Sequence, residues 1–546
     1  MRAREVIYYD VSPFAALSAQ ATTGNNVASF SEPERLFKEN QVFRSIQTCE
    51  NNYTVLDGTH SAFGDSEDEP ENIALWSRAQ SLHPSRELPG VVELDVRFGG
   101  LQSSPGIAFY FDRDNNNYCD WLSVSWYRGG ALVSAGDFRP TGPVYSCVRQ
   151  VEHYDRVRVR FRRLNMPHRY LRVEAVIFGI VRFFSDDSLE GLMISEGADP
   201  SGRSVYINSA HFTVNTQDPV PYLFLKRQPI QIKYGGGLVG VYYIDKSKKL
   251  ADRRYSIEAV DKIGVLDNTD EFLGGMYYNT PAGTIIRAIV GGIFDVNVDA
   301  SLENVPVTGW LPILKKRAAL AQVALAVGAV VDASRTGEIK IRRMPEQLSK
   351  LIGRERVYAG GSVDIAFPYT GIELIEHNYT VGAEAEDLFK DTFTGQKLVK
   401  FRKPASNLSI SGGVIIEMGV NYARISSTGG GECVLRGRPF IDNQNSVIIR
   451  TGDLVEGTQE KIEKIERCWL VNRRISREVA QRLYNYYLRQ HVFKGDILLD
   501  LDELERVGDV VRVATGFEDD ITGQIEKLAL SFGHKNIKAR GVIRGN

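Results

Sequence analysis

The sequence predicts a mainly β protein with an α/β segment, and three observations support this fold class. Runs of alternating apolar and polar residues recur through residues 48–191, with hardly any helical pattern. The order strand, strand, helix, helix, strand follows between residues 240 and 343. From residue 346 onward the chain returns to strands, interrupted by one helix with Ser476 as its expected N-cap. With 546 residues, the chain is long enough for roughly three to four domains of about 150 residues each.

The α/β segment has the clearest pattern. Residues 255–261 alternate like a half-buried strand. Thr280 and Pro281 predict a helix start, with Thr280 as N-cap and Pro281 in the first turn, where its missing N–H costs nothing. Each of the two predicted helices carries an apolar stripe; the residues are Ile285, Ile286, Ile289 and Val290 in the first and Leu320, Val323, Ala324 and Val327 in the second. This core has no pattern of reactive chemistry, which indicates a scaffold.

Three runs of this segment carry a resemblance to a known family. They are YSIEAVDKIGVLD at 255–267, GGMYYNTPAGTII at 274–286 and VPVTGWLPILKKRAALAQVALAVGAVVDASRTGEIKI at 305–341. Together they resemble the central domain of the tail hub proteins of bacteriophages, prophages and phage-derived contractile bacteriocins. The stretches 507–513, 521–527 and 538–541 are similar to the last β-barrel strands of the same hubs. With residues 226–249, the resemblance covers about the C-terminal three-fifths of the chain.

The resemblance implies the place and the partners of the protein. Hubs of this family form a homotrimeric ring that links the tail tube to the baseplate and spike, with two tail-hub β-barrels and an α/β core domain in each subunit. The expected partners are therefore two further copies, the tail tube or distal tail protein, the spike or tip protein and the tape-measure protein. The expected location is the virion tail tip or baseplate, or a bacteriocin particle (a tailocin), assembled in the cytoplasm of the bacterial host.

The chain divides into four predicted domains. Residues 1–47 and 192–252 form the first hub barrel, and residues 253–345 form the α/β core domain. Residues 346–546 form a β-rich domain that includes the second barrel. Within residues 48–191 we expect an inserted antiparallel β-sandwich, because period-2 strands such as 92–97, 122–126 and 156–161 are separated by polar turns.

The inserted stretch carries a weaker resemblance of its own. The phrases at 51–58, 118–121 and 167–171 resemble a carbohydrate-module sandwich of the galactose-binding-like type. Aromatic faces beside Asp and Asn side chains are what a sugar pocket uses, because the rings stack on sugar faces and the polar groups take the hydroxyls. The candidate glycan contacts are Tyr110, Asp112, Asp114, Trp121, Trp126 and Tyr127. Aromatic residues of a sandwich are more often core, and this alternative stays open for each of them.

Residues 112–117 also resemble an oxygen-rich calcium loop. Asn117 stands where such a loop has a glycine at its sixth position, and Ser123 stands where it has a glutamate at its twelfth. Asp and Asn are turn-forming residues in any case. We therefore expect a solvated turn and no metal.

Composition and spacing exclude several other classes of function. The 66 basic and 68 acidic residues balance, which gives no bulk signal for nucleic acid or anionic membranes. No apolar run approaches the ~20 residues that span a bilayer, and MRAREVIYYDVSPF lacks the apolar region of a signal peptide. The five cysteines are too few and too scattered for a disulfide framework or a zinc site, so free buried thiols are expected.

No catalytic motif emerges from the sequence. The eight histidines show no metal-ligand spacing, no GxSxG elbow occurs, and no glycine cluster opens a helix as a phosphate loop does. The sequence therefore predicts no catalytic residue, no cofactor, no metal and no enzyme. The main alternative to a tail hub is a host-surface glycan-binding (receptor-binding) tail protein that acts through the sandwich. A cell-wall hydrolase is a third and weaker alternative.

Overall fold

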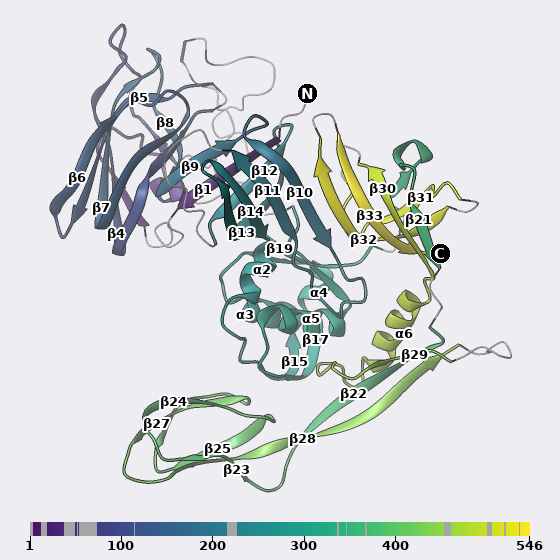
Figure 1. The fold of residues 1–546 in the computed structure, drawn as a ribbon. Coiled ribbons are helices and arrows are strands. Elements are labelled where there is room, and N and C mark those ends of the chain that lie inside the picture. Colours follow the sequence, from purple (N-terminus) through teal and green to yellow (C-terminus); the bar gives the residue numbers. More distant parts are fainter. Residues whose placement is uncertain are drawn as a thin grey trace. The chain divides into compact units, whose positions relative to one another are not determined.

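The computed structural model describes residues 4–11, 19–37, 48, 50–51, 53, 74–113, 115–215, 227–335, 338–345, 347–365, 369–451, 460–499, 505–517, 520–533 and 536–546. The chain forms two compact units (Figure 1). The sandwich unit comprises Ile7–Phe184 and Tyr222–Ile230, and the large unit comprises Met1–Val6, Ser185–Pro221 and Gln231–Asn546. Strands dominate the chain and helices are few, which confirms the predicted mainly β class with an α/β segment.

The sandwich unit is built on one antiparallel sheet in the order β3-β8-β4-β7-β5-β6, with β2 paired to β4. Its elements are β2 (Ala19–Thr23), η1 (Pro33–Phe37), β3 (Leu75–Trp76), β4 (Glu87–Phe111), β5 (Cys119–Arg128), β6 (Ala131–Phe138), β7 (Val144–Leu164), β8 (Arg172–Ile177) and β9 (Gly179–Phe184). In Figure 1 most of these strands are drawn in blue.

The sheet of the sandwich unit makes both layers of a sandwich, because β4 and β7 are long enough to serve both. Val92 lies opposite Phe161 in one half of the β4–β7 pair, and Gly106 lies opposite Val148 in the other half. Register shifts separate the halves, and such bulges bend strands. Buried residues from both halves share one core, in which the rings of Phe109 and Phe161 meet edge to face at 5.9 Å. The expected antiparallel sandwich is therefore present.

The large unit contains a long sheet in the order β21-β30-β33-β32-β10-β11-β14-β13-β12. Its strands are β10 (Leu189–Gly197), β11 (Ser209–Asn215), β12 (Pro229–Tyr234), β13 (Gly237–Ala251), β14 (Arg254–Val260), β20 (Lys350–Ile352), β21 (Ser362–Ile365), β30 (His491–Leu498), β31 (Val510–Val513), β32 (Ile521–Phe532) and β33 (Ile537–Gly545); β20 pairs with β31, and β31 with β32. The strand β1 (Arg4–Val11) crosses the division between the two units. The strands predicted for two separate barrels thus lie on one hydrogen-bonded path, joined where β10 pairs with β32.

The α/β segment follows β14. It consists of α2 (Lys262–Asp267), β15 (Gly275–Pro281), α3 (Ala282–Val290), β16 (Val296–Val298), α4 (Ala300–Glu303), β17 (Pro306–Leu311), α5 (Lys316–Val327), β18 (Ala329–Asp332) and β19 (Ile339–Arg343). The apolar stripes predicted for α3 and α5 are buried against each other in one core. Both helices end at a glycine in the left-handed region, Gly291 and Gly328, as C-terminal caps commonly do.

A second β-rich region and one helix complete the large unit. Its elements are η2 (Arg354–Arg356), β22 (Gly371–Val381), β23 (Glu386–Asp391), β24 (Thr394–Lys400), β25 (Ala405–Ser411), β26 (Val414–Met418), β27 (Tyr422–Thr428), β28 (Cys433–Arg450), β29 (Ile462–Ile465) and α6 (Ser476–Tyr487). Strands β23, β28, β22 and β29 form one sheet, with β25 paired to β28, and β24, β27 and β26 form another. Figure 1 shows β22 and β28 as a long ribbon.

Both predicted helix caps are wrong by one residue. Thr280 and Pro281 close β15, where they pair with Val307 and Pro306, so α3 begins at Ala282. Ser476 lies inside α6, and its hydroxyl donates to the carboxylate of Glu376 at 2.8 Å. A side chain that is engaged elsewhere cannot cap a helix.

The first predicted domain also differs in part from the structure. The strand β2 lies in the stretch 1–47 that was assigned to the first barrel, yet it pairs with β4 of the sandwich unit, with Ala21 opposite Val96. The strand β11 begins at Ser209, directly after Asn208, whose side chain accepts a hydrogen bond from the N–H of Gly197 and donates one to Asp261. Local alternation does not tell which distant strand a segment will join.

Among the described residues, no helix is both long and apolar enough to cross a membrane. Cys119, Cys147, Cys433 and Cys468 are free and buried, as predicted. Cys49 lies outside the described residues.

Candidate functional site

The candidate site is the side of the sandwich sheet that points away from the core. We call it the outer face, and it is formed by strands β4, β7, β5 and β6. Its residues are Glu93, Asp95 and Arg97 on β4; Arg156, Arg158, Arg160 and Arg162 on β7; Trp121, Ser123, Ser125 and Tyr127 on β5; Asp137 on β6; and Arg139, which comes directly after β6. The pairing register places these side chains in rows, since Arg160 lies opposite both Glu93 and Ser123. The residues between them along β7, Val157, Val159 and Phe161, are buried in the core.

Carboxylates neutralise part of the arginine column. Asp95 accepts hydrogen bonds from Arg156 at 2.8 Å and from Arg158 at 3.1 Å, and Glu93 contacts Arg158 at 3.1 Å and Arg160 at 2.8 Å. Burial raises the pKa of Asp95, but the hydrogen bonds from Arg156 and Arg158 outweigh it and hold that pKa below its ordinary value. These two carboxylates together hold three guanidinium groups in place.

The opposite end of the outer face has arginines without carboxylate partners. The guanidinium of Arg139 lies over the Trp121 ring at 4.1 Å from its centroid, and that of Arg162 lies at 5.3 Å. Arg162 donates to the hydroxyl of Ser123 at 2.9 Å, and this hydroxyl donates in turn to Asp137. Neither arginine forms an ion pair with a carboxylate of the described residues, so this end of the face has two guanidinium groups against the single carboxylate of Asp137.

The aromatic candidates of β5 occupy different surroundings. Trp126 is fully buried and packs edge to face on Phe138, so the structure places it in the core and away from any ligand. Tyr127 lies on the outer face with Arg156 and Arg158 over its ring at 5.4 and 5.7 Å. Trp121 and Tyr127 are thus covered by guanidinium groups rather than open for stacking on a sugar.

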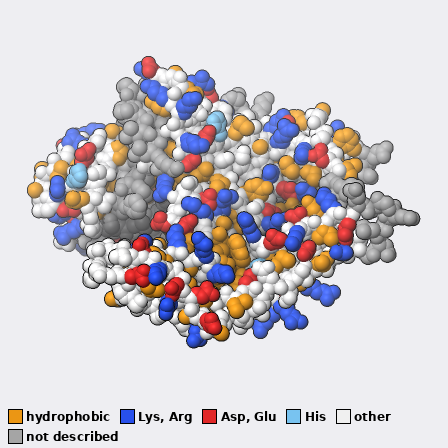
Figure 2. Space-filling model, turned by 60° about the horizontal axis from the view of Figure 1, so that its bottom comes forward, with side chains coloured by type: hydrophobic (Ala, Val, Ile, Leu, Met, Phe, Trp, Pro, Cys, Tyr) orange, Lys and Arg blue, Asp and Glu red, His pale blue; other side chains and the backbone are white. Residues whose placement is uncertain are grey.

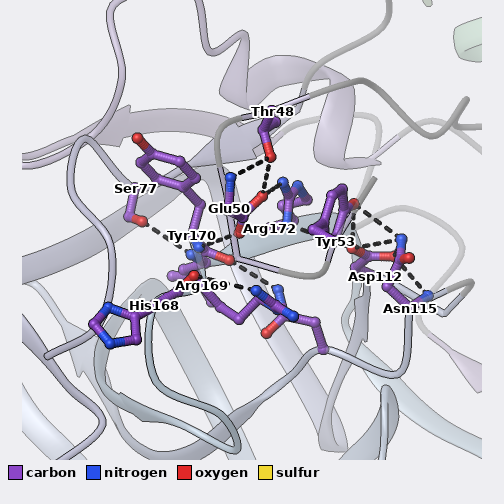
Figure 3. A network of polar contacts seen from close by, with 12 residues as sticks. Thr48, Glu50, Tyr53, Ser77, Asp112, Asn115, His168, Arg169, Tyr170 and Arg172 are labelled. Atoms are coloured by element: carbon purple, nitrogen blue, oxygen red, sulfur yellow. Dashed lines mark hydrogen bonds and ion pairs between the residues drawn. The ribbon is translucent and has the colours of Figure 1, made fainter. Parts of the chain in front are cut away.

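Asp112 belongs to a buried polar network that lies apart from the outer face (Figure 3). Its carboxylate accepts hydrogen bonds from the Tyr53 hydroxyl at 2.7 Å and from the Asn115 side chain at 3.0 Å. Arg172, with 6% of its side chain exposed, lies 3.5 Å from Asp112 and forms an ion pair with the fully buried Glu50. Asp112 is therefore engaged by the protein and is not available as a sugar contact.

The same network closes around Arg172. Glu50 accepts hydrogen bonds from Arg172 at 3.2 Å and from the backbone N–H of Tyr170 at 2.6 Å. The guanidinium of Arg172 also lies 4.2 Å from the ring centroids of both Tyr53 and Trp76, a favourable cation–π geometry. Figure 3 shows these side chains converging on one another, which indicates that the network fastens residues 48–53 to the sandwich.

The remaining candidates lie near this network. Tyr110 is half-buried on β4, and the guanidinium of Arg113 lies 5.6 Å from its ring centroid. Arg113 donates to Glu174 at 3.0 Å, yet burial raises the pKa of Glu174 to about 7. Asp114 lies outside the described residues. Of the five predicted contacts that the structure describes, Trp126 lies in the core, Trp121 and Tyr127 lie on the outer face, and Asp112 lies in the buried network, so these do not share one pocket.

The sequence contains a pattern that indicates the outer face, although it matches none of the motifs considered above. In RVRVRFRR, residues 156–163, arginine occupies every second position, which places four arginines on one side of a strand. Arg139 has no such signal, because its place over Trp121 depends on the β5–β6 pairing. In the described part of the chain, no group of three or more His, Cys, Asp or Glu residues could hold a metal ion.

Comparisons with known proteins give fold likeness alone. No family model and no curated protein matches the chain. Among solved structures, it is similar to a tail protein from Neisseria meningitidis MC58, at 10% identity and a TM-score of 0.43, over 78% of this chain and 97% of the other. It is also similar to the 43 kDa tail protein of prophage MuSo2 from Shewanella oneidensis, at 11% identity and a TM-score of 0.41, over 66% and 95% of the two chains. A third is prophage tail protein gp18 from Listeria monocytogenes EGD-e, at 11% identity and a TM-score of 0.39, over 67% and 91%.

Proposed function

We propose that this chain is a structural tail hub, which forms a trimeric ring between the tail tube and the baseplate and spike of a phage tail or a phage-derived particle. The observation that carries the proposal is a set of apolar side chains left exposed on strands of the large unit. Its support from the sequence is the resemblance of the α/β segment, which folds into a packed apolar core. Its partners would be two further copies, the tube or distal tail protein, the spike or tip protein and the tape-measure protein.

The exposed apolar strands are unusual for an isolated subunit. Val414 and Met418 on β26 are 65% and 63% exposed, and β26 is an edge strand that pairs with β27 alone in its sheet. Ile441 on β28 and Ile365 on β21 are exposed as well. The face turned forward in Figure 2 shows hydrophobic side chains gathered between charged ones. Exposed apolar edges favour aggregation unless another surface covers them, so they favour a subunit interface.

The mass of the purified chain in solution tests the ring. Obligate ring interfaces bury about 2,000 Å² or more, so isolated subunits should associate. Light scattering on a size-exclusion column should give three times the 61.0 kDa of one chain. The double variant V414K/M418K should lower this mass, whereas L132K/V133K, which changes exposed apolar residues of the sandwich unit, should leave it unchanged. A monomer at high concentration that also fails to bind tube or baseplate components would contradict the hub.

We also propose that the chain has no catalytic activity. The buried carboxylates of the sandwich unit, Glu50 and Asp112, are held by Arg172 and Tyr53 rather than left free to transfer protons. A wall hydrolase remains the contrary hypothesis. Zymography on host cell walls decides between them, because a clearing band would establish hydrolysis.

The second candidate function is attachment to a host surface through the sandwich unit, compatible with a place on the hub. The uncompensated arginines of the outer face favour it. A deletion of residues 48–191 would be a poor test, because β2 pairs with β4 and η1 also belongs to this unit. Substitutions on the outer face are a cleaner test. They should abolish adsorption to host cells and leave tails assembled if the sandwich unit binds the host.

A further inference from the structure

We propose that the outer face of the sandwich unit binds a linear, ring-free polyanion of the polyol-phosphate class, with Arg139 and Arg162 as its main contacts. The inference rests on the second function proposed above, attachment through the sandwich unit, and it names the chemistry of the ligand. It does not depend on whether the chain forms a ring.

The charge of the outer face fits an anion. Six arginines share it with three carboxylates; these are Arg97, Arg139, Arg156, Arg158, Arg160 and Arg162 against Glu93, Asp95 and Asp137. Glu93 and Asp95 engage the middle of the column, whereas Arg139 and Arg162 have no carboxylate partner among the described residues. Both are exposed, and a planar guanidinium presents paired donors that match a phosphate or carboxylate.

The aromatic residues distinguish between kinds of polyanion. Proteins bind single-stranded nucleic acids and sugars by stacking bases or sugar rings on open aromatic faces. Here Arg139 lies 4.1 Å from the ring centroid of Trp121, and Arg156 and Arg158 lie over Tyr127. These rings serve to hold guanidinium groups by cation–π contact, so the face offers charge without a stacking platform. A polymer with charged groups and no rings fits this surface best.

The strand geometry suits an extended chain. Outward side chains of one strand recur about every 6.6 to 6.8 Å, since each residue advances a strand by about 3.3 to 3.4 Å. The arginines of β7 from Arg156 to Arg160 form such a row, and a register shift opposite Trp121 and Leu122 places Arg162 at a bulge at its end, where Arg139 also lies over the Trp121 ring. A flexible linear polymer can follow such a row over several of its charges, whereas a double helix would need a broader basic surface.

Calorimetric titration of the full-length chain with purified poly(glycerol phosphate) tests the inference. The wild-type chain should bind with an affinity that falls as salt is added, because the contacts are ionic. The double variant R139Q/R162Q should lose about tenfold or more in affinity at low salt, as expected for two lost charge-assisted hydrogen bonds. R139K/R162K should recover part of the binding, because it restores the charge but not the paired donors of the guanidinium groups. The matched control R402Q/K403Q removes two exposed cations of the large unit and should bind like the wild type.

Several results would overturn the inference. They are absence of binding by the wild-type chain, equal binding by R139Q/R162Q at an unchanged melting temperature, and equal affinity for alginate or single-stranded DNA, which would indicate an acidic polysaccharide or a nucleic acid instead. If the wild-type chain ignores the polymer but host-cell adsorption still requires the sandwich unit, this inference fails and the attachment function stands. If adsorption and polymer binding are both absent, the attachment function fails as well.

Discussion

A single buried guanidinium, that of Arg172, joins two parts of the sandwich unit that lie 122 residues apart in the chain. Removing a charged group from water costs free energy, and the cost is recovered only when partners surround the group. Glu50 and Asp112 provide negative charge, and the rings of Tyr53 and Trp76 provide cation–π contact. Because the same burial raises the pKa of Tyr53, its hydroxyl stays protonated and donates to Asp112. Arg172 therefore decides whether the part of the chain that carries Glu50 and Tyr53 stays attached to the sandwich.

Replacing Glu50 with alanine tests this attachment. The substitution leaves Arg172 buried beside a lost partner, and breaking a buried pair in this way typically costs about 3–5 kcal/mol of stability. The urea midpoint of the sandwich unit, followed by tryptophan fluorescence, should fall accordingly. E258Q is the control, because Glu258 forms an ion pair with Lys246 in which both side chains are exposed. Its loss should give no measurable change in stability. An equal response of the two variants would mean that the buried pair contributes nothing.

Glu174 should make the stability of the sandwich unit depend on pH. Its pKa is about 7 in the folded chain and 4.5 as its ordinary value, so the folded state keeps a proton that the unfolded state releases between these values. The contribution of Glu174 to stability is therefore greatest below pH 4.5 and is lost as the pH rises to 7, by up to about 3 kcal/mol. The E174Q variant has no titrating group at this position, so its free energy of unfolding should increase relative to that of the wild type as the pH rises from 4.5 to 7. Parallel pH profiles for the two proteins would contradict the raised pKa.

At the scale of elements, the sequence predicted which segments form strands and helices better than it predicted their partners. The stripes of α3 and α5 are confirmed because 3.6-residue periodicity reports a buried face directly. The predicted caps at Thr280 and Ser476 are wrong because both residues are engaged elsewhere. Thr280 pairs with β17, and the Ser476 hydroxyl donates a hydrogen bond to Glu376. The arginine row of β7 was visible in the sequence, but its meeting with Trp121 and Arg139 required the register of the β5–β6 hairpin.

The contact between β17 and residues 469–470 depends on a glycine. Gly309 has a φ of +151°, and an added Cβ would lie 2.6 Å from the carbonyl oxygen of Trp469 and 2.9 Å from the Cα of Leu470. Since both of these atoms belong to the backbone, G309A must push the two segments apart. This should reduce the free energy of unfolding by about 1–3 kcal/mol and so lower the melting temperature of the large unit by several degrees. G275A is the control on the paired strand β15, because its Cβ would meet only the Tyr277 ring at 3.5 Å. Equal melting temperatures for the two variants would show that the segments yield freely.

At the scale of the whole molecule, the two units differ in how far apart their paired strands lie in the chain. In the sandwich unit, β5 pairs with its sequence neighbour β6, and β3 pairs with β8, with Leu75 opposite Val173. In the large unit, Ile194 of β10 lies opposite Leu530 of β32. The sequence predicted a strand at 521–527, within β32, but none at β10, and it could not have predicted their pairing, because alternation is the same for a strand that joins a near or a distant partner.

A chain truncated after residue 520 tests the importance of this pairing. It lacks β32 and β33, so the edge of β10 would be left without its partner strand. Residues that are buried against β32 and β33 in the full-length chain would then face water. We expect the truncated protein to aggregate, and dynamic light scattering measures this directly. A truncated chain that stays monodisperse and keeps the melting temperature of the full-length protein would show that β10 needs no such partner.

The β10–β32 pairing also has a consequence for biosynthesis. A ribosome releases the sandwich strands hundreds of residues before it releases β32, and domains usually fold as they emerge. The sandwich unit can therefore fold during translation, whereas β10 must wait in a nascent chain until β32 has been made. During that interval its open edge is a target for chaperones and for the edges of neighbouring nascent chains on the same messenger RNA. The need for quality control is thus greatest in the interval between the synthesis of β10 and that of β32.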